Sequence, residues 1–177
     1  MPIALDFFLK YGYAIVLLWV LTEQLGIPIP STPLLLTAGT LGATHQLNLP
    51  LVWAAALVGS LIADTVWYIF GQRYGSAVVR LMCRLSLESS ACVRKTEGYF
   101  TQRGAAALLV AKFIPGLGAV AAPIAGQLGM GFGKFLLFDA GGVLLWAVTV
   151  TLGGYFFGDI LRHNPGALSW TLHFFGV

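Results

Sequence analysis

Charged residues are scarce in this sequence, and long stretches contain none. Only 10% of the 177 residues are Asp, Glu, Lys or Arg, and 58% are hydrophobic, whereas soluble domains carry about 25% charged residues. No formal charge occurs in residues 24–63, 113–133 or 140–158, and a helix needs about 20 apolar residues to cross a membrane. These gaps exclude an ordinary soluble domain and predict an integral membrane protein with several embedded segments.

Cysteine and histidine are also few, and their positions exclude most site chemistries. The two cysteines, Cys83 and Cys92, lie in a basic segment with no histidine nearby, so neither a zinc site nor a disulfide framework is expected. The sequence contains no nucleophile elbow, phosphate-binding loop or nucleic-acid-binding motif. We therefore expect no metal site, no cofactor, no enzymatic activity and no nucleic-acid partner.

The basic residues concentrate in one segment between the apolar blocks. Residues 71–104 hold six of the ten Lys and Arg but only two of the seven Asp and Glu. Basic loops stay on the cytoplasmic side of a membrane, so we predict that segment 73–103 is cytoplasmic and forms amphipathic helices at the membrane surface. The uncharged loop Thr44–Pro50 then lies on the opposite face, and Leu51–Phe70 is the span that separates the two loops.

Two apolar blocks are interrupted by proline and glycine, the first over residues 26–39 and the second over Ala105–Leu128. Proline removes a backbone donor, and unsatisfied backbone groups are not tolerated in hydrocarbon. We therefore predict two re-entrant loops rather than two continuous spans, with a proline kink between ordinary spans as the alternative. The loop residues are Pro28, Pro30 and Pro33 in the first block and Pro115, Gly116, Pro123 and Gly126 in the second.

The two interrupted blocks resemble each other, which indicates an internal repeat. With a shift of 87 positions, Ile27–Pro28 aligns with Ile114–Pro115, and Ala38–Gly42 aligns with Ala125–Gly129. Each block is followed by a full-length apolar span. Because the basic segment lies between the two units, the units have opposite orientations, which is the plan of many secondary transporters.

The predicted fold class is therefore an all-α integral membrane protein with an inverted-topology repeat, each unit being a re-entrant helical hairpin followed by a transmembrane helix. The chain forms one domain. Repeat one covers about residues 10–72, the cytoplasmic segment covers 73–103, and repeat two covers about 104–158. The apolar C-terminal segment 165–177 is too short to span, so we expect either an interfacial segment or an incomplete helix.

Three charged residues fall within or beside these apolar blocks: Glu23, Asp64 and Lys112. An unpaired charge at the bilayer centre costs about 2.5–3.5 kcal/mol or more, so each should face a partner or a cavity. We expect the repeat to bring Glu23 near Lys112. In the functional interpretation Lys112 binds a phosphate or another anionic headgroup, and Glu23 or Asp64 binds a proton; in the alternative, these charges form a structural salt bridge. Asp139 is expected near a membrane interface.

Several motifs, in this order, resemble the DedA family, also called the VTT or SNARE-associated domain family. The motifs are E-x-x-G-I-P-I-P at Glu23–Pro30, D-T-V-W-Y-x-x-G-Q-R-Y-G at Asp64–Gly75, and Y-F-x-x-R-G with K-F-I-P-G-L and P-I-A-G within Tyr99–Gly126. The resemblance covers about residues 10–160. It implies a multi-pass bacterial inner-membrane protein with two re-entrant hairpins that moves lipids between leaflets, either undecaprenyl phosphate or phospholipid, with coupling to protons or to the membrane potential.

Two positions lack a charged residue that is usual in the family. Thr32 stands where a second acid is usual, and Gly118 stands where a second arginine is usual, while Lys112 replaces the first arginine. Lysine keeps the charge but lacks the planar fork of arginine for bidentate phosphate contacts. We hypothesise that the missing acid and base form a pair in other members. The expected function is lipid translocation with a membrane lipid as partner; a proton-coupled transporter of a small solute, a non-transporting scaffold and a homo-oligomer stay open.

Overall fold

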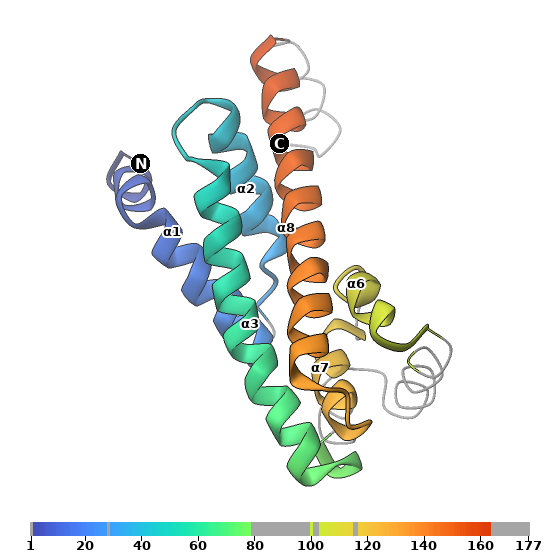
Figure 1. Ribbon diagram of the computed structural model, residues 1–177. Coiled ribbons are helices and arrows are strands. Elements are labelled where there is room, and N and C mark those ends of the chain that lie inside the picture. Colours follow the sequence, from blue (N-terminus) through green and yellow to red (C-terminus); the bar gives the residue numbers. More distant parts are fainter. Residues whose placement is uncertain (1, 28, 79–99, 101–102, 115–116, 164–177) are drawn as a thin grey trace, which may run out of the picture.

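The computed structural model describes residues 2–27, 29–78, 100, 103–114 and 117–163, and the elements in these ranges are helical. They are α1 (Pro2–Gln24), α2 (Thr32–Ala43), α3 (Leu49–Tyr74), the short 3-10 turn η1 (Gly104–Ala106), α6 (Ala107–Ala111), α7 (Leu117–Gln127) and α8 (Phe132–His163) (Figure 1). Pro28, Pro115, Gly116, most of the basic segment 73–103 and the C-terminal segment 165–177 lie outside the described residues.

Two long helices form the centre of the described bundle. Within the described residues, Leu49–Tyr74 and Phe132–Gly158 are the helices long and apolar enough to cross a membrane, with 26 and 27 residues. At 1.5 Å per residue either is longer than the roughly 30 Å hydrocarbon core. α3 and α8 pack against each other and run in opposite directions (Figure 1). The prediction of an all-helical protein with two full-length apolar helices is confirmed.

The chain breaks twice between shorter helices, once between α1 and α2 and once between α6 and α7. Both breaks lie level with the middle of α3 and with the lower part of α8 (Figure 1). The predicted loops are too long, however. Pro33 stands in the first turn of α2, where a missing N–H and a fixed φ are tolerated, and both Pro123 and Gly126 lie inside α7. The second break is therefore confined to the few residues between Ala111 and Leu117.

The packing of the shorter helices follows a repeated pattern in which α2 lies against α8 and α7 lies against α3. A Cβ atom added at Gly39 of α2 would overlap the backbone of Thr151 on α8, and one added at Gly126 of α7 would overlap the backbone of Tyr68 on α3. Gly126 follows Gly39 by 87 positions, and Thr151 follows Tyr68 by 83. Each unit thus packs its second hairpin helix on the long helix of the other unit.

The first helix of each hairpin repeats in the same way but stays within its own unit. Gly59 of α3 lies against the backbone of α1 at Leu17, and Gly142 of α8 lies against the backbone of α6 at Leu108. The two glycines are again 83 positions apart. Absence of a side chain at these points allows helix backbones to approach closely, as small residues do in membrane helix pairs.

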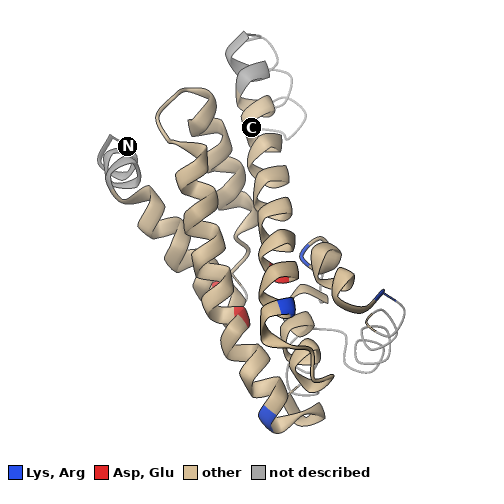
Figure 2. Cartoon of the chain, in the orientation of Figure 1, with Lys and Arg blue, Asp and Glu red and all other residues tan. Residues whose placement is uncertain are grey.

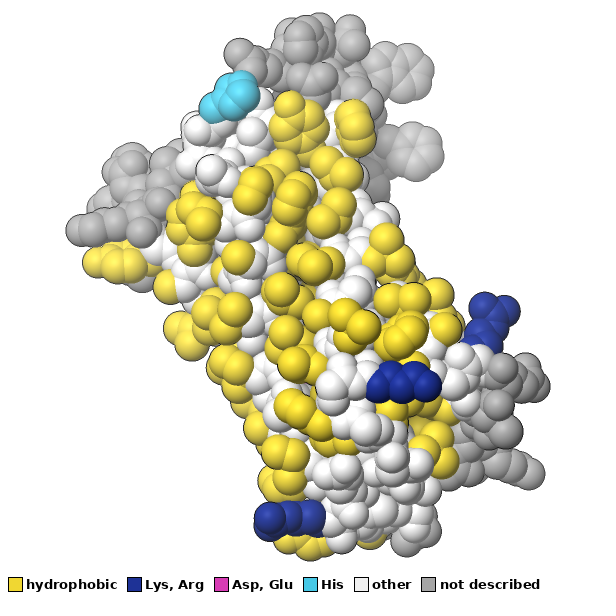
Figure 3. Space-filling model, in the orientation of Figure 1, with side chains coloured by type: hydrophobic (Ala, Val, Ile, Leu, Met, Phe, Trp, Pro, Cys, Tyr) yellow, Lys and Arg dark blue, Asp and Glu magenta, His cyan; other side chains and the backbone are white. Residues whose placement is uncertain are grey.

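Two apolar clusters fill the interior and leave a polar layer between them. One cluster includes Val52 and Ala56 of α3 and Trp146 of α8. The other includes Tyr68 of α3 and Phe135 of α8. Ser60 and Asp64 of α3 and Asp139 of α8 are buried polar residues that fall between these positions, whereas the buried Thr151 of α8 lies beyond Trp146. Outside, the face drawn in Figure 3 is hydrophobic along most of its described length and carries no acidic side chain, as suits contact with lipid tails.

Candidate functional site

A buried ion pair lies between the two units. Lys112 follows the last residue of α6, and its Nζ lies 2.6 Å from Oδ2 of Asp64 on α3. The side chains of Lys112 and Asp64 are 5% and 4% exposed. This pair is the one salt bridge found among the described residues. Lys112, at the break in the second hairpin, therefore pairs with the long helix of the first unit.

Neutral polar groups extend this pair toward α1. The Ser60 hydroxyl, one helical turn before Asp64, donates to Asp64 Oδ2 at 2.8 Å and accepts from Lys112 Nζ at 3.1 Å. Gln24, the last residue of α1, donates from Nε2 to Ser60 Oγ at 3.4 Å. Trp67 of α3 holds Gln24 in place by donating from Nε1 to its carbonyl oxygen at 3.0 Å. The network thus links the end of the first hairpin helix to the second hairpin.

Asp139 of α8 completes what we call the charge cluster, defined as Ser60, Asp64, Lys112 and Asp139. Its carboxyl lies within hydrogen-bonding reach of the Asp64 carboxyl and interacts electrostatically with Lys112. Asp139 is 2% exposed, and its Oδ2 has no hydrogen-bond partner. Asp139, which is expected near a membrane interface, therefore lies inside the bundle rather than on its surface. Figure 2 shows the described acidic positions in one band across the middle of the bundle.

Glu23 occupies a separate position at the first break. Its Oε1 accepts a hydrogen bond from the backbone N–H of Ser31 at 3.1 Å, and Ser31 is the residue that precedes α2. A carboxylate at a helix N-terminus satisfies an unpaired donor and favours the positive end of the helix dipole. Glu23 Oε2 and Ser31 Oγ are both buried without a partner.

Glu23 and Lys112, which the repeat is expected to bring near each other, form no ion pair. The acid that pairs with Lys112 is Asp64, and the contribution of α1 to the cluster comes from the neighbouring amide of Gln24.

Sequence reasoning left three members of this network out of the candidate site, for different reasons. Ser60 lies four residues before Asp64 and so shares its helix face, a signal that was available. Asp139 is an acid in an apolar stretch, which by itself marks a functional candidate. Gln24 carries no such signal, because its role depends on how α1 packs against α3.

The two positions that depart from the resembled pattern lie at the starts of α2 and α7. Thr32 is the first residue of α2. A Cβ atom at Gly118 would lie 3.4 Å from the Ala111 carbonyl oxygen and 3.6 Å from Lys112 Cα, which is ordinary contact. A side chain at position 118 would therefore stand beside Lys112.

The cluster offers one cation and two acids for chemistry. The described residues contain no group of three or more His, Cys, Asp or Glu that could hold a metal ion. The side chains of Lys112 and Asp64 are nearly closed to solvent. An anionic ligand can therefore reach Lys112 only after the contact with Asp64 opens.

Comparison with known proteins places the chain among membrane proteins. The VTT domain family matches residues 29–156. An uncharacterized membrane protein of Synechocystis is 32% identical over 93% of this chain and 75% of its own length. An uncharacterized membrane protein of Mycobacterium tuberculosis is 32% identical over 84% of this chain and 70% of its own. Protein DedA of Escherichia coli K12 is 29% identical over 85% of this chain and 72% of its own. No solved structure matches the chain.

Proposed function

Because this chain belongs to the DedA family of VTT-domain membrane proteins, we propose that it moves a phosphate-bearing lipid between membrane leaflets, with undecaprenyl phosphate or a phospholipid as substrate. The observation that carries the proposal is the charge cluster, which is buried inside an apolar bundle and takes its cation from the break in the second hairpin. Intramembrane ionisable residues mark substrate or ion pathways. The protein would be a multi-pass protein of the bacterial inner membrane.

The repeated helix contacts support an inverted repeat as the architecture for this transport. The glycine positions of α3 recur on α8 with one constant shift, and the two long helices are antiparallel. In such repeats, interrupted helices meet near the midplane and the two units move against each other around a fixed site. The breaks between α1 and α2 and between α6 and α7 would be the tips of two re-entrant hairpins.

In the proposed route, Lys112 receives the phosphate group while the lipid tails stay outside the bundle. The outer surface supplies large exposed apolar side chains along the long helices, such as Leu51, Val58 and Ile62 on α3 and Leu145 and Phe156 on α8. A headgroup reaching the cluster must compete with Asp64 for Lys112, so the cluster is a gated site rather than an open one.

The experiment is a leaflet-exchange assay on the purified protein in liposomes that contain a fluorescent phospholipid or a labelled polyprenyl phosphate. Movement of label to the outer leaflet, measured by a membrane-impermeant quencher, is the expected result. Lys112→Ala should abolish this movement, and Thr149→Val should not. Thr149 is a matched control on α8 because its exposed hydroxyl bonds only the Leu145 carbonyl one turn earlier.

Three results would replace this proposal. Uptake of a soluble anion without lipid movement would make the protein a solute transporter. Movement that survives Lys112→Ala would remove the cluster from the route. Full complementation of a deletion strain by a variant without the cluster charges would favour a scaffold.

A further inference from the structure

Asp139 is a buried acid that the proposed headgroup contact does not use. It lies on α8, is 2% exposed, and has an oxygen without any hydrogen-bond donor. Burying an ionised carboxylate without a partner is strongly unfavourable, and Lys112 is already bonded to Asp64 at 2.6 Å. The cluster therefore holds one more acid than its single cation can neutralise.

The polar groups of the charge cluster and its neighbours come from α3, from the second break and from α1. α3 supplies Asp64 and the neutral Ser60, the second break supplies Lys112, and α1 supplies the neutral amide of Gln24. No further Lys or Arg reaches the cluster from the described residues, and Glu23 is bonded to the start of α2 instead. With both aspartates ionised, the cluster would carry one net negative charge inside the bundle.

Asp139 also lies within hydrogen-bonding reach of the Asp64 carboxyl. Two ionised carboxylates cannot bond each other, because each can only accept; a carboxyl pair needs one proton as the donor. A proton needs no added space and neutralises the cluster, whereas a metal ion would need a ligand set that the described residues do not supply.

We propose that Asp64 and Asp139 share one bound proton, so that α3 and α8 are joined at the cluster by a carboxylic acid–carboxylate pair next to Lys112. The pair links the long helices of the two units through a group that can be lost to solvent. Deprotonation leaves two carboxylates facing each other, which repel, and both then compete for Lys112. The role of this proton in transport rests on the proposed function, but its presence does not.

The test is infrared spectroscopy of the purified protein at neutral pH, which detects the C=O stretching band of protonated carboxyl groups. Labelling all aspartates with carbon-13 at the side-chain carboxyl should shift the band and so assign it to aspartate rather than to glutamate. The expected result is a band of one carboxyl that is lost in both Asp139→Asn and Asp64→Asn. Each variant leaves one acid opposite Lys112 and keeps the cluster neutral, so neither should need the proton.

Thermal unfolding in detergent provides a second readout that needs no spectral assignment. The melting temperature of the wild type should fall as the pH is raised and the shared proton is lost. The fall should be reduced or absent in Asp139→Asn, whereas Thr149→Val should match the wild type. A band that keeps its intensity in both aspartate variants, or a band that does not shift with labelled aspartate, would overturn the proposal.

Sodium is the competing ligand, and the same samples distinguish it. If the wild type shows no protonated aspartate and is stabilised by Na⁺ but not by N-methylglucamine, the shared proton is overturned. If liposomes show no lipid movement but the aspartate band is present and lost in Asp139→Asn, the proton site stands while the proposed function fails. Lipid movement with no such band would support the proposed function and overturn the shared proton.

Discussion

At the scale of single residues, substitutions in the Lys112–Asp64 pair distinguish its effect on stability from its effect on transport. Removing one partner of a buried ion pair leaves the other charge uncompensated and costs about 3–5 kcal/mol. We therefore expect Lys112→Met to lower the free energy of unfolding by that amount, measured by denaturant titration in detergent. Adding Asp64→Asn should recover most of the loss, because it removes the carboxylate that Lys112 neutralised and leaves the bound proton to Asp139 alone.

The same double variant should still fail to move lipid, because the cation proposed to receive the phosphate is gone. This double-mutant cycle has a clear contrary outcome. If Lys112→Met/Asp64→Asn regains both stability and lipid movement, the pair is structural and the headgroup contact lies elsewhere.

Two substitutions of Glu23 distinguish the effect of its hydrogen bond from the effect of its charge. Glu23→Gln keeps an oxygen that can accept from the Ser31 N–H, so stability should change little. Glu23→Ala leaves that N–H unsatisfied, which costs about 1–3 kcal/mol for a buried donor. If the charge takes part in transport, the leaflet-exchange rate should fall in both variants; a normal rate in Glu23→Gln would limit the residue to holding the start of α2.

At the scale of helices, the glycine contacts of α2 and α7 predict equal effects in the two units. A Cβ atom at Gly39 or at Gly126 would overlap backbone atoms of the facing long helix. In each variant the short helix must therefore move away from the long helix on which it packs. We expect Gly39→Ala and Gly126→Ala each to destabilise the protein by about 1–3 kcal/mol, the usual cost of overpacking.

Gly133 is the matched control for these substitutions. It lies in α8, and nothing stands within 4 Å of its added Cβ, so Gly133→Ala should be neutral or should stabilise the helix by up to about 1 kcal/mol. A loss confined to one of the two packing glycines, as measured by the melting temperature, would show that the repeated contacts are not energetically equivalent.

The sequence determines the helices of this protein better than it determines their partners. Apolar length predicts α3 and α8, and the prolines predict that the chain breaks before α2. The general rule that proline ends a helix places Pro33 and Pro123 in loops, although the first turn of α2 accommodates one and α7 contains the other. The exchange of α2 and α7 between units, and with it the pairing of Lys112 with Asp64, depends on contacts between residues far apart in the chain, which no local pattern encodes.

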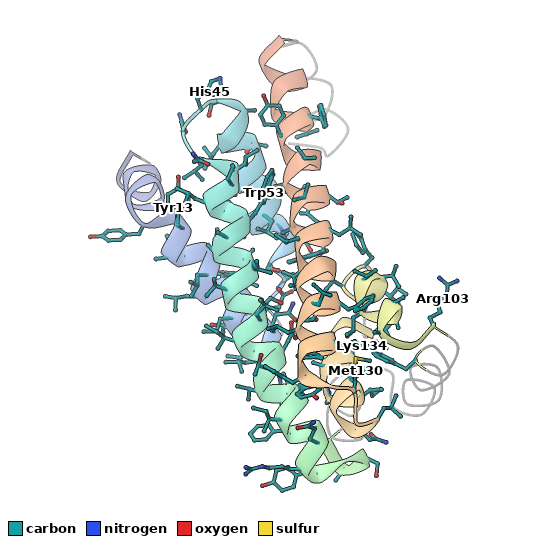
Figure 4. The ribbon with its side chains drawn as sticks, in the orientation of Figure 1. Tyr13, His45, Trp53, Arg103, Met130 and Lys134 are labelled. Carbon is teal, nitrogen blue, oxygen red and sulfur yellow. The ribbon has the colours of Figure 1, made fainter. Side chains whose placement is uncertain are left out.

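At the scale of the whole molecule, side chains tie the two units together at several heights. Trp53 of α3, labelled in Figure 4, donates from Nε1 to Thr151 Oγ1 of α8 at 2.8 Å. The charge cluster joins the same helices farther along, and the Tyr68 hydroxyl of α3 donates to the Met130 carbonyl just before α8. Any rocking of one unit against the other must therefore break or exchange polar contacts, and the charge cluster is the contact whose ionic partners can be exchanged.

The orientation of the hairpins gives the last prediction. In Figure 1 the start of α1 and the end of α2 lie at one end of the bundle, and the starts of α6 and α8 lie lower on it. If both hairpins are re-entrant, Tyr11 and Thr44 face the outside of the cell, whereas Arg103 and Gly131 face the cytoplasm with the basic segment. All four positions are exposed, so each accepts a single cysteine after Cys83 and Cys92 are replaced by serine.

A membrane-impermeant maleimide applied to intact cells should label cysteines at positions 11 and 44, and should reach positions 103 and 131 only after the membrane is permeabilised. A hairpin that crossed the membrane completely would instead place positions 11 and 44 on opposite faces, because α1 and α2 would form one passage. Labelling of 44 without 11, or of 131 without 103, in intact cells would therefore contradict the inverted repeat, and with it the meeting of the two breaks at mid-membrane that gives Lys112 its proposed role.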